Sequence, residues 1–328
     1  MIDLTTKYMG FTLKNPVIIG SSGLTNSVAA VKEHASNGAA AVVLKSLFEE
    51  QIRMEAQKNI DMAGSDNLYT EAQDYISNYI RAHNLNEYLK LIEDCRKSVD
   101  IPVFASINCV TSDEWPAFAQ KIESAGASGL ELNVFILPSD FSRDAEENEN
   151  TYFKIVDQVK KYVKIPVSLK ISYHFTNLAQ MIQKLSFTGI SGIVLFNRFF
   201  SPDFDLINRQ IVPSHIFSNP ADLSVSLRWV GIMYDRVRCD ICASTGIHDA
   251  SGVIKQIMAG ANAVQMVSSI YKNGSKYIKV VLEEMEKWME NNGFHSLSEM
   301  RGQMSQARIK DPAGFERVQF MKYFAGID

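Results

Sequence analysis

The chain is poor in cysteine, in excess charge and in histidine. Four cysteines among 328 residues cannot form the disulfide framework of a small secreted domain. Lys plus Arg number 33 against 37 for Asp plus Glu, so the net charge is −4 and no basic surface for nucleic acid is predicted. The six histidines are scattered without metal-ligand spacing, and we expect no metal site.

Long hydrophobic runs are missing too. No apolar stretch approaches the roughly 20 residues that span a bilayer, and the opening MIDLTTKYMG lacks the design of a signal peptide. We therefore expect a cytoplasmic protein with no membrane partner. Cys239 and Cys242 form a CxxC motif, but positions three apart on a strand face opposite sides. With no second Cys or His pair nearby, we expect a structural role for both.

What the chain does contain is a repeated junction between a helix end and a strand. Gly stands where a helix would end in the left-handed conformation. A short apolar run follows without polar alternation, as in strands buried on both faces. The copies are NGAAAVVLKS from Asn37, AGASGLELN from Ala125, TGISGIVLFN from Thr188 and AGANAVQMVSS from Ala259. Four more apolar runs, NPVIIGSSG, IPVFASIN, IPVSLKIS and RCDICASTG, bring the predicted strands to eight.

Segments with helical spacing of apolar residues lie between these strands. They cover residues 27–36, 87–98, 115–124, 152–163, 177–185, 224–234, 251–258 and 277–291. Eight strand–helix units in succession predict an α/β fold of the (β/α)8 TIM barrel type. A doubly wound sheet is the rival, and both the strand count and the missing GxGxxG after the first strand argue against it.

Four segments lie outside this repeat. Residues 3–15 alternate and turn at Gly10, which predicts a hairpin that closes the bottom of the barrel. Residues 47–84, after the second strand, form a long insertion and a candidate lid. Residues 198–219 form a second excursion after the sixth strand. We expect residues 1–295 to make the barrel and 296–328 to form a helical extension packed on it.

Polar residues gather at the carboxyl ends of the predicted strands, where TIM barrels carry their sites. Alternation puts Glu131 with Asn133, and Lys170 with Ser172, on one face each. Lysines and amides in an apolar interior would each cost several kcal/mol unless a ligand or partner met them. A polar ligand is therefore expected, although single Ser or Asn side chains could instead satisfy one another and cap strand ends.

The two lysines at strand ends leave two chemistries open. Lys45 and Lys170 could neutralise negative charge that develops on a bound ring, or either could act as an amine nucleophile. The run ASTGIHDASG and the Ser pair at the end of the last strand predict a phosphate cradle. A cofactor-free Schiff-base lyase or aldolase acting on a phosphorylated substrate is thus one reading.

Taken in order over residues 3–290, the segments DLTTKYMGFTLKNPVIIGSSG, VVLKS, LELN, IPVSLKIS and TGIHDASGVIKQIMAGANAVQMVSS resemble the dihydroorotate dehydrogenase family of FMN-binding TIM barrels. The resemblance implies an FMN-dependent oxidoreductase of pyrimidine biosynthesis. Hydride would pass between flavin N5 and a small planar polar substrate, dihydroorotate or a related dihydropyrimidine. Lys170 would lie near the pyrimidine edge of the ring. The implied cofactor-binding residues are Ser22, Gly23, Lys45, Ser46, Asn108, Asn133, Lys170, Asn197, Ser244, Thr245, Gly246, Ser268 and Ser269.

The chain also departs from the family's pattern. After the LELN strand the family carries a Cys or Ser that removes a proton from the substrate; here the stretch is VFILPSD, and Ile136 or Leu137 stands in its place. Neither can accept a proton. Ser139 or His174 could replace the base, as could Tyr173. The candidate catalytic residues are Lys170, Lys45, His174 and Ser139.

Two further departures concern the family's loops. The Asn-rich substrate loop has no clear match in MAGSDNLYTEAQDY, and ASTG keeps Gly246 but loses a neighbouring glycine. The resemblance therefore implies a member of the family but does not specify its substrate. A flavin-holding barrel without turnover is a third reading. The expected partners are a small-molecule substrate, an electron acceptor of unspecified kind and a second copy of the chain in a homodimer.

Overall fold

Eight parallel strands close into a barrel, as the sequence predicts. The structure, a computed structural model, describes residues 2–48, 70–108, 115–199 and 201–316. The strands are β3 (Val17–Ile19), β4 (Ala41–Val43), β6 (Val103–Asn108), β7 (Gly129–Asn133), β8 (Val167–Ile171), β9 (Gly192–Leu195), β12 (Asp240–Ser244) and β13 (Ala263–Met266). Their order is β4-β3-β13-β12-β9-β8-β7-β6, and pairing of β4 with β6 closes the ring. This confirms the TIM barrel and excludes the doubly wound sheet.

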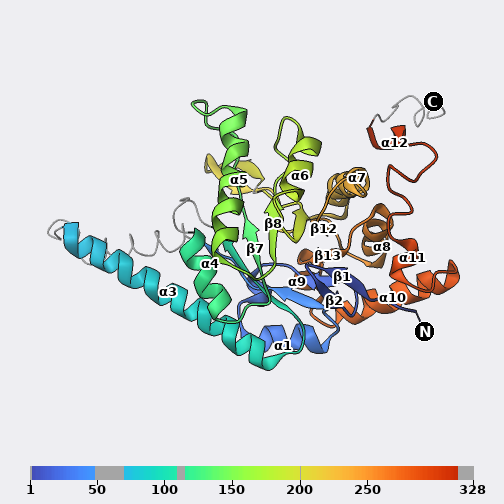
Figure 1. Ribbon diagram of the computed structural model, residues 1–328, viewed down its shortest axis with the longest axis horizontal. Helices are drawn as coiled ribbons and strands as arrows, with labels where there is room; N and C mark the ends of the chain where they lie inside the picture. The colour runs from blue at the N-terminus through green and yellow to red at the C-terminus, as the bar shows by residue number, and fades with distance from the viewer. Residues whose placement is uncertain (1, 49–69, 109–114, 200, 317–328) are drawn as a thin grey trace.

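Helices surround the barrel and follow the strands along the chain (Figure 1). The main ones are α1 (Val28–Ser36), α3 (Thr70–Ser98), α4 (Trp115–Ser124), α5 (Ala145–Tyr162), α6 (Leu178–Ser186), α7 (Leu223–Met233), α8 (Ala250–Ala259) and α10 (Tyr277–Asn291). Short elements are η1 (Gly23–Thr25), η3 (Pro220–Asp222), α9 (Ser268–Asn273), α11 (Leu297–Met300) and α12 (Ala313–Glu316). Of the described helices, none is both long and apolar enough to cross a bilayer.

Two helices begin earlier than their apolar spacing predicts. Helix α5 begins at Ala145, because Asp144 and Glu147 form a capping box ahead of the apolar residues. Helix α3 begins at Thr70, well before the predicted start at residue 87, and neither Gly nor Pro interrupts residues 70–98. The end of the predicted 47–84 insertion is therefore helical. Residues 49–69 lie outside the described residues, so the lid itself stays a prediction.

The N-terminal hairpin closes the bottom of the barrel. Strands β1 (Thr6–Tyr8) and β2 (Phe11–Leu13) pair antiparallel around a two-residue turn. Both turn residues have positive φ, 52° at Met9 and 82° at Gly10, which is the hairpin geometry that favours glycine. Tyr8 is buried inside the barrel and meets the Phe104 ring edge-on at 6.2 Å. The barrel is thus plugged at the end opposite the carboxyl ends of its strands.

The excursion after β9 contains a hairpin. Strands β10 (Pro202–Asp205) and β11 (Gln210–Pro213) pair antiparallel and are largely exposed. Strand β5 (Leu47–Phe48), which the sequence does not predict, pairs with the end of β6. After α10, residues up to 316 carry the short helices α11 and α12. Residues 317–328 of the predicted extension lie outside the described residues.

Candidate functional site

A cavity of about 490 Å³ lies at the carboxyl ends of the strands; we call it the mouth cavity. Its lining comes from β3, β8, β9, β12 and β13 and from the loops that follow them. The lining residues are Ser21, Lys170, Phe196, Asn197, Arg198, Ile216, Phe217, Ser218, Ser244, Thr245, Gly246, Ile247, Gln265, Val267, Ser268 and Tyr271. Its volume lies within the range of small-molecule sites, about 300–1,000 Å³.

A hydrogen-bonded triad of Lys170, Gln265 and Glu131, from three strands, lies at the floor of the mouth cavity. Lys170 Nζ on β8 donates to Gln265 Oε1 on β13 at 2.8 Å. Gln265 Nε2 in turn donates to Glu131 Oε2 on β7 at 2.5 Å, and Glu131 Oε1 lies 3.8 Å from Lys170 Nζ. Glu131 is 1% exposed and Lys170 8% exposed, so both charges are withdrawn from water and depend on each other. Only Lys170 and Gln265 reach the cavity lining.

Polar pairs extend this arrangement around the barrel mouth. Asn197 Nδ2 donates to Asn133 Oδ1, which joins the ends of β9 and β7. The Ser46 hydroxyl lies 3.0 Å from that of Ser21 and 2.7 Å from that of Ser106, so the ends of β3, β4 and β6 are joined as well. The expectation that strand-end Ser and Asn satisfy one another is thus met for these residues. They hold the rim of the cavity in place.

Tyr88 on α3 supports this rim from outside. Its hydroxyl donates to Ser106 O at 3.0 Å and accepts from Ser106 N at 2.8 Å. Burial raises the pKa of Tyr88, so the hydroxyl stays protonated and can donate. Tyr88→Phe should leave both backbone groups without this partner. We expect a loss of about 1–3 kcal/mol in the free energy of unfolding, measured by urea titration.

Tyr162→Phe is the control for that substitution. Tyr162 is 51% exposed on α5, so loss of its hydroxyl should change stability by no more than about 0.5 kcal/mol. Equal losses in the free energy of unfolding for Tyr88→Phe and Tyr162→Phe would mean that the hydrogen bonds to Ser106 do not stabilise the protein.

The predicted phosphate end of the cavity is built from the loop after β12 and the start of α9. Thr245 and Gly246 both have positive φ, 77° and 78°. A Cβ on Gly246 would lie 2.1 Å from Leu223 N, so the close turn requires glycine. Ser268 Oγ accepts from Ser218 N at 3.0 Å. Burial, together with nearby Lys272, lowers the pKa of His248.

The apolar loop after β7 forms part of an aromatic cluster. Val134 is buried, and the Phe135 ring lies 3.9 Å from that of Phe199 between centroids. The centroid of the His174 ring lies 4.5 Å from that of Phe199, edge to face, and 4.6 Å from that of Tyr173, whose ring is tilted against it by 32°. The VFIL stretch that replaces the family's base therefore contributes packing and no proton acceptor.

Several predicted site residues meet at the mouth cavity, whereas others lie elsewhere. Lys170, Asn197, Ser244, Thr245, Gly246 and Ser268 line the cavity, and Asn133 reaches it through its bond to Asn197. The residues absent from this lining are Ser22, Gly23, Lys45, Ser46, Asn108, Ser139, His174 and Ser269.

The residues outside the lining have other surroundings. The Ser22 side chain caps the short helix η1 by accepting from Leu24 N at 3.3 Å. A Cβ on Gly23 would meet the Tyr271 hydroxyl at 2.6 Å. Lys45 is exposed beside buried Ser46. Ser139 lies on the exposed loop after β7.

Sequence reasoning missed Gln265, Arg198 and Tyr271. Gln265 is a polar residue inside the apolar strand AVQM, so the alternation argument that singled out Glu131 could have found it. Arg198 and Tyr271 carry no comparable signal, because a loop fold and a helix start bring them to the cavity.

Within the described residues, the thiols and the side chains that could bind a metal form no second site. Cys242 is fully buried and Cys239 partly buried, and both are free thiols. Burial raises the pKa of Cys239 to about 12, so it stays protonated at neutral pH. Across the described part of the chain, no three His, Cys, Asp or Glu side chains are grouped to hold a metal ion.

The comparisons with known proteins agree with this geometry. The profile of the family described as Dihydroorotate dehydrogenase matches residues 3–289. The chain belongs to the dihydroorotate dehydrogenase family. A relative from Thermoplasma volcanium, named Dihydroorotate dehydrogenase B (NAD(+)), catalytic subunit, is 26% identical over 314 residues, which cover 92% of this chain and 98% of the relative. Proteins of the same name from Thermoplasma acidophilum and Methanocaldococcus jannaschii are 25% and 26% identical over 308 residues each, covering 92% and 91% of this chain and 99% and 97% of the relatives.

Members of the dihydroorotate dehydrogenase family are FMN-dependent oxidoreductases that act on CH–CH groups, and this chain is one of them. The mouth cavity suits the cofactor in two respects. Its volume is adequate. Its lining also includes the hydrogen-bonding side chains of Lys170, Asn197, Ser244 and Ser268, which could meet the polar ring edge and the phosphate of FMN.

Proposed function

We propose that FMN binds in the mouth cavity and that the chain transfers hydride between the flavin and a small planar polar molecule. The triad of Lys170, Gln265 and Glu131 carries this proposal, because it puts one cationic side chain on the floor of a cavity of adequate volume. Lys170 and Asn197 would hold the polar edge of the ring. Gly246 and Ser268 would lie by the phosphate.

When bound, FMN supplies a hydride acceptor at N5. Oxidation of a CH–CH group also releases one proton from the neighbouring carbon, so a base is needed beside the substrate. Tyr173 and His174 lie just beyond the end of β8, three and four residues after Lys170, and no hydrogen bond is found to the Tyr173 hydroxyl or the His174 ring nitrogens within the described part of the chain. They are the candidates for this role, since the apolar loop cannot fill it. Dihydroorotate and related dihydropyrimidines are the candidate substrates.

The electrons must leave the flavin to complete a turnover. The names of the relatives specify NAD(+) and a catalytic subunit. We therefore propose a nicotinamide dinucleotide as the final acceptor, reached through a partner subunit. A cytoplasmic location and assembly of two copies of the chain belong to the same proposal.

The visible spectrum of the purified protein tests flavin binding. We expect a yellow protein whose absorbance bleaches with dithionite and which releases FMN on denaturation. Protein that stays colourless after incubation with FMN would contradict the proposal. Lysine chemistry would then become the better reading, and borohydride trapping with phosphosugars would test it.

Stopped-flow mixing separates turnover from mere flavin holding. Anaerobic holoprotein is mixed with dihydroorotate or dihydrouracil, and flavin bleaching is followed. Bleaching by either compound supports the oxidoreductase with a dihydropyrimidine substrate. No bleaching by any of a panel of dihydropyrimidines would favour a flavin-binding barrel without turnover, to which the apolar loop at 134–137 already points.

A further inference from the structure

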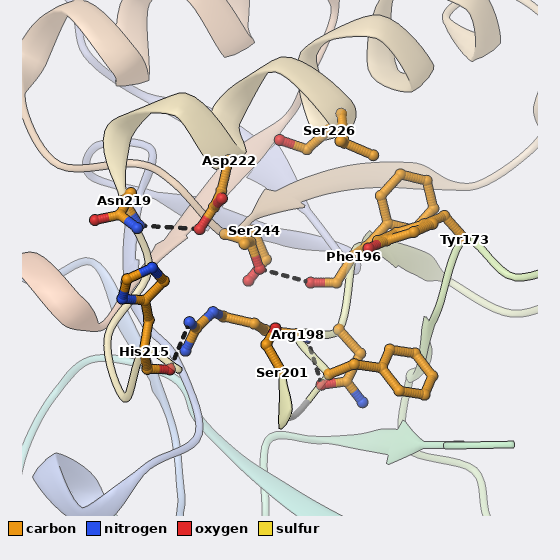
Figure 2. A pocket seen from close by; sticks show the side chains of 13 residues that line it. Tyr173, Phe196, Arg198, Ser201, His215, Asn219, Asp222, Ser226 and Ser244 are labelled. Atoms are coloured by element: carbon orange, nitrogen blue, oxygen red, sulfur yellow. Dashed lines mark hydrogen bonds between the residues drawn. The ribbon is translucent and has the colours of Figure 1, made fainter. Parts of the chain in front are cut away.

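A second cavity of about 150 Å³, here called the side cavity, adjoins the mouth cavity. It lies beyond the ends of β8, β9 and β12 and against the start of α7 (Figure 2). The two cavities share the lining residues Phe196, Asn197, Arg198, Ser244 and Thr245. A molecule in the side cavity would therefore lie next to whatever fills the mouth cavity.

Arg198 is half-buried where the two cavities meet, and hydrogen bonds fix both its backbone and its side chain. Its backbone N donates to Asn197 Oδ1 at 3.0 Å. Its guanidinium donates through Nη1 to Ile216 O at 2.6 Å and through Nη2 to His215 O at 2.8 Å (Figure 2). A guanidinium held at two nitrogens has little further freedom to lose when it binds a ligand.

The Arg198 guanidinium keeps its charge and part of its donor set. A guanidinium has five N–H donors, and the two backbone carbonyls use two of them without neutralising the cation. Arg198 forms none of the ion pairs found among the described residues. Asp222 lines the side cavity as well, but its Oδ2 accepts from Asn219 N at 2.9 Å (Figure 2). Three N–H donors of Arg198 therefore remain for an anionic ligand.

The mouth cavity is cationic on the same side. Among the described residues that line it, Lys170 and Arg198 are the basic side chains, and no carboxylate accompanies them. Lys170 already has a counter-ion, because Glu131 Oε1 lies 3.8 Å from its Nζ. Of these two basic residues, only Arg198 also lines the side cavity. A ligand in the side cavity would thus meet a cation that has no counter-ion within the described part of the chain.

Aromatic rings form one wall of the side cavity. Tyr173, Phe196 and Phe199 all line it. Tyr173 meets Phe196 edge-on at 5.7 Å between centroids, and the Phe199 ring lies 3.9 Å from that of Phe135. Rings packed in this way offer faces and edges to a planar ligand. A cavity of about 150 Å³ is large enough for a single six-membered ring.

We propose that Arg198 is the residue that determines which ligand binds beside FMN, because it holds the carboxylate of a planar ring that packs on the aromatic wall. The remaining N–H groups of the guanidinium can donate to both oxygens of a carboxylate. A ring without this group leaves the cation without a counter-ion and binds more weakly. The proposal deepens the proposed function and rests on it, because FMN must fill the mouth cavity.

Orotate and uracil test the assignment, because they share one ring and differ by a carboxylate. Each is titrated into FMN-loaded full-length protein, and the ligand-induced change in the flavin spectrum gives the Kd. We expect orotate to bind at least about tenfold more tightly, since hydrogen bonds between a guanidinium and a carboxylate are strong. Uracil binding as tightly or more tightly, or neither compound binding, overturns the proposal.

Arg198→Met isolates the contribution of the guanidinium, because it removes the charge and the donors and keeps much of the apolar bulk. We expect the Kd of orotate to rise about tenfold or more and that of uracil to change by less than about threefold. Equal weakening of the two ligands would show that Arg198 only holds residues 215–216 in place, and it overturns the proposal. Arg198→Gln serves as the milder variant if the methionine protein loses its fold, since its amide can still donate to a carbonyl.

Arg228→Met is the matched control. Arg228 is exposed on α7 and lines neither cavity, so both Kd values should equal those of the wild-type protein. An equal loss of orotate affinity in this variant would mean that the net charge of the protein sets the preference, and it overturns the assignment to Arg198.

The FMN affinity of each variant separates the two proposals. If Arg198→Met weakens FMN binding and leaves the preference for orotate intact, the guanidinium holds the FMN phosphate, and the assignment of Arg198 to the substrate is overturned alone. Failure of the wild-type protein to bind FMN refutes the proposed function instead.

Discussion

Gly246→Ala is expected to destabilise the protein by about 3–5 kcal/mol and to abolish FMN binding. Two costs add at this position. The φ of +78° disfavours any side chain by about 1–2 kcal/mol. The new Cβ would also lie 2.1 Å from Leu223 N and 2.7 Å from Asp222 C, both backbone atoms that cannot rotate away. The turn must therefore move, and with it the lining of the mouth cavity. Urea unfolding and FMN titration measure the two effects.

Gly274→Ala separates these costs. Gly274 has nearly the same φ, +77°, but nothing lies within 4 Å of the position of its Cβ. Only the backbone cost of about 1–2 kcal/mol should appear, with FMN affinity unchanged. Similar losses of stability in the two variants would show that the clash between a Cβ at position 246 and the backbone at the start of α7 does not contribute to the loss.

Lys170→Met should cost about 3–5 kcal/mol of stability, because it leaves Glu131 charged and buried without its counter-ion. Adding Glu131→Gln removes that charge, so the double variant should regain most of the stability. FMN affinity should stay low in both, since the cation on the cavity floor is gone. Urea unfolding of the four proteins in a double-mutant cycle gives the coupling between the two side chains.

Lys161→Met provides the control for a lysine in an ion pair. Lys161 Nζ lies 2.6 Å from Asp157 Oδ2, a shorter distance than that between Lys170 and Glu131. The side chains of Lys161 and Asp157 are both more than 60% exposed. Little change in stability is expected there, because water already solvates both charges. A double variant no more stable than Lys170→Met alone would show that Glu131 does not depend on Lys170.

Much of the architecture could be predicted because local rules and long-range packing agree. A glycine at each helix end and a short, non-alternating apolar run locate the eight strands. The alternation of polar residues within strands also singled out Glu131 and Lys170 as inward-facing, and both lie at the barrel mouth. Apolar spacing does not predict the start of α3 at Thr70, because this helix is polar and the apolar pattern along it is weak.

The sequence by itself determined the barrel, its hairpin plug and the chemical character of the strand ends, since these follow from residue spacing within each unit. Only the tertiary structure decided which polar groups meet. Gln265 reaches Glu131 and Lys170 from a distant strand, and Arg198 is tied to the carbonyls of a loop that folds back on it. Such contacts arise from closure of the sheet and from loop conformation, and neither leaves a local pattern in the chain.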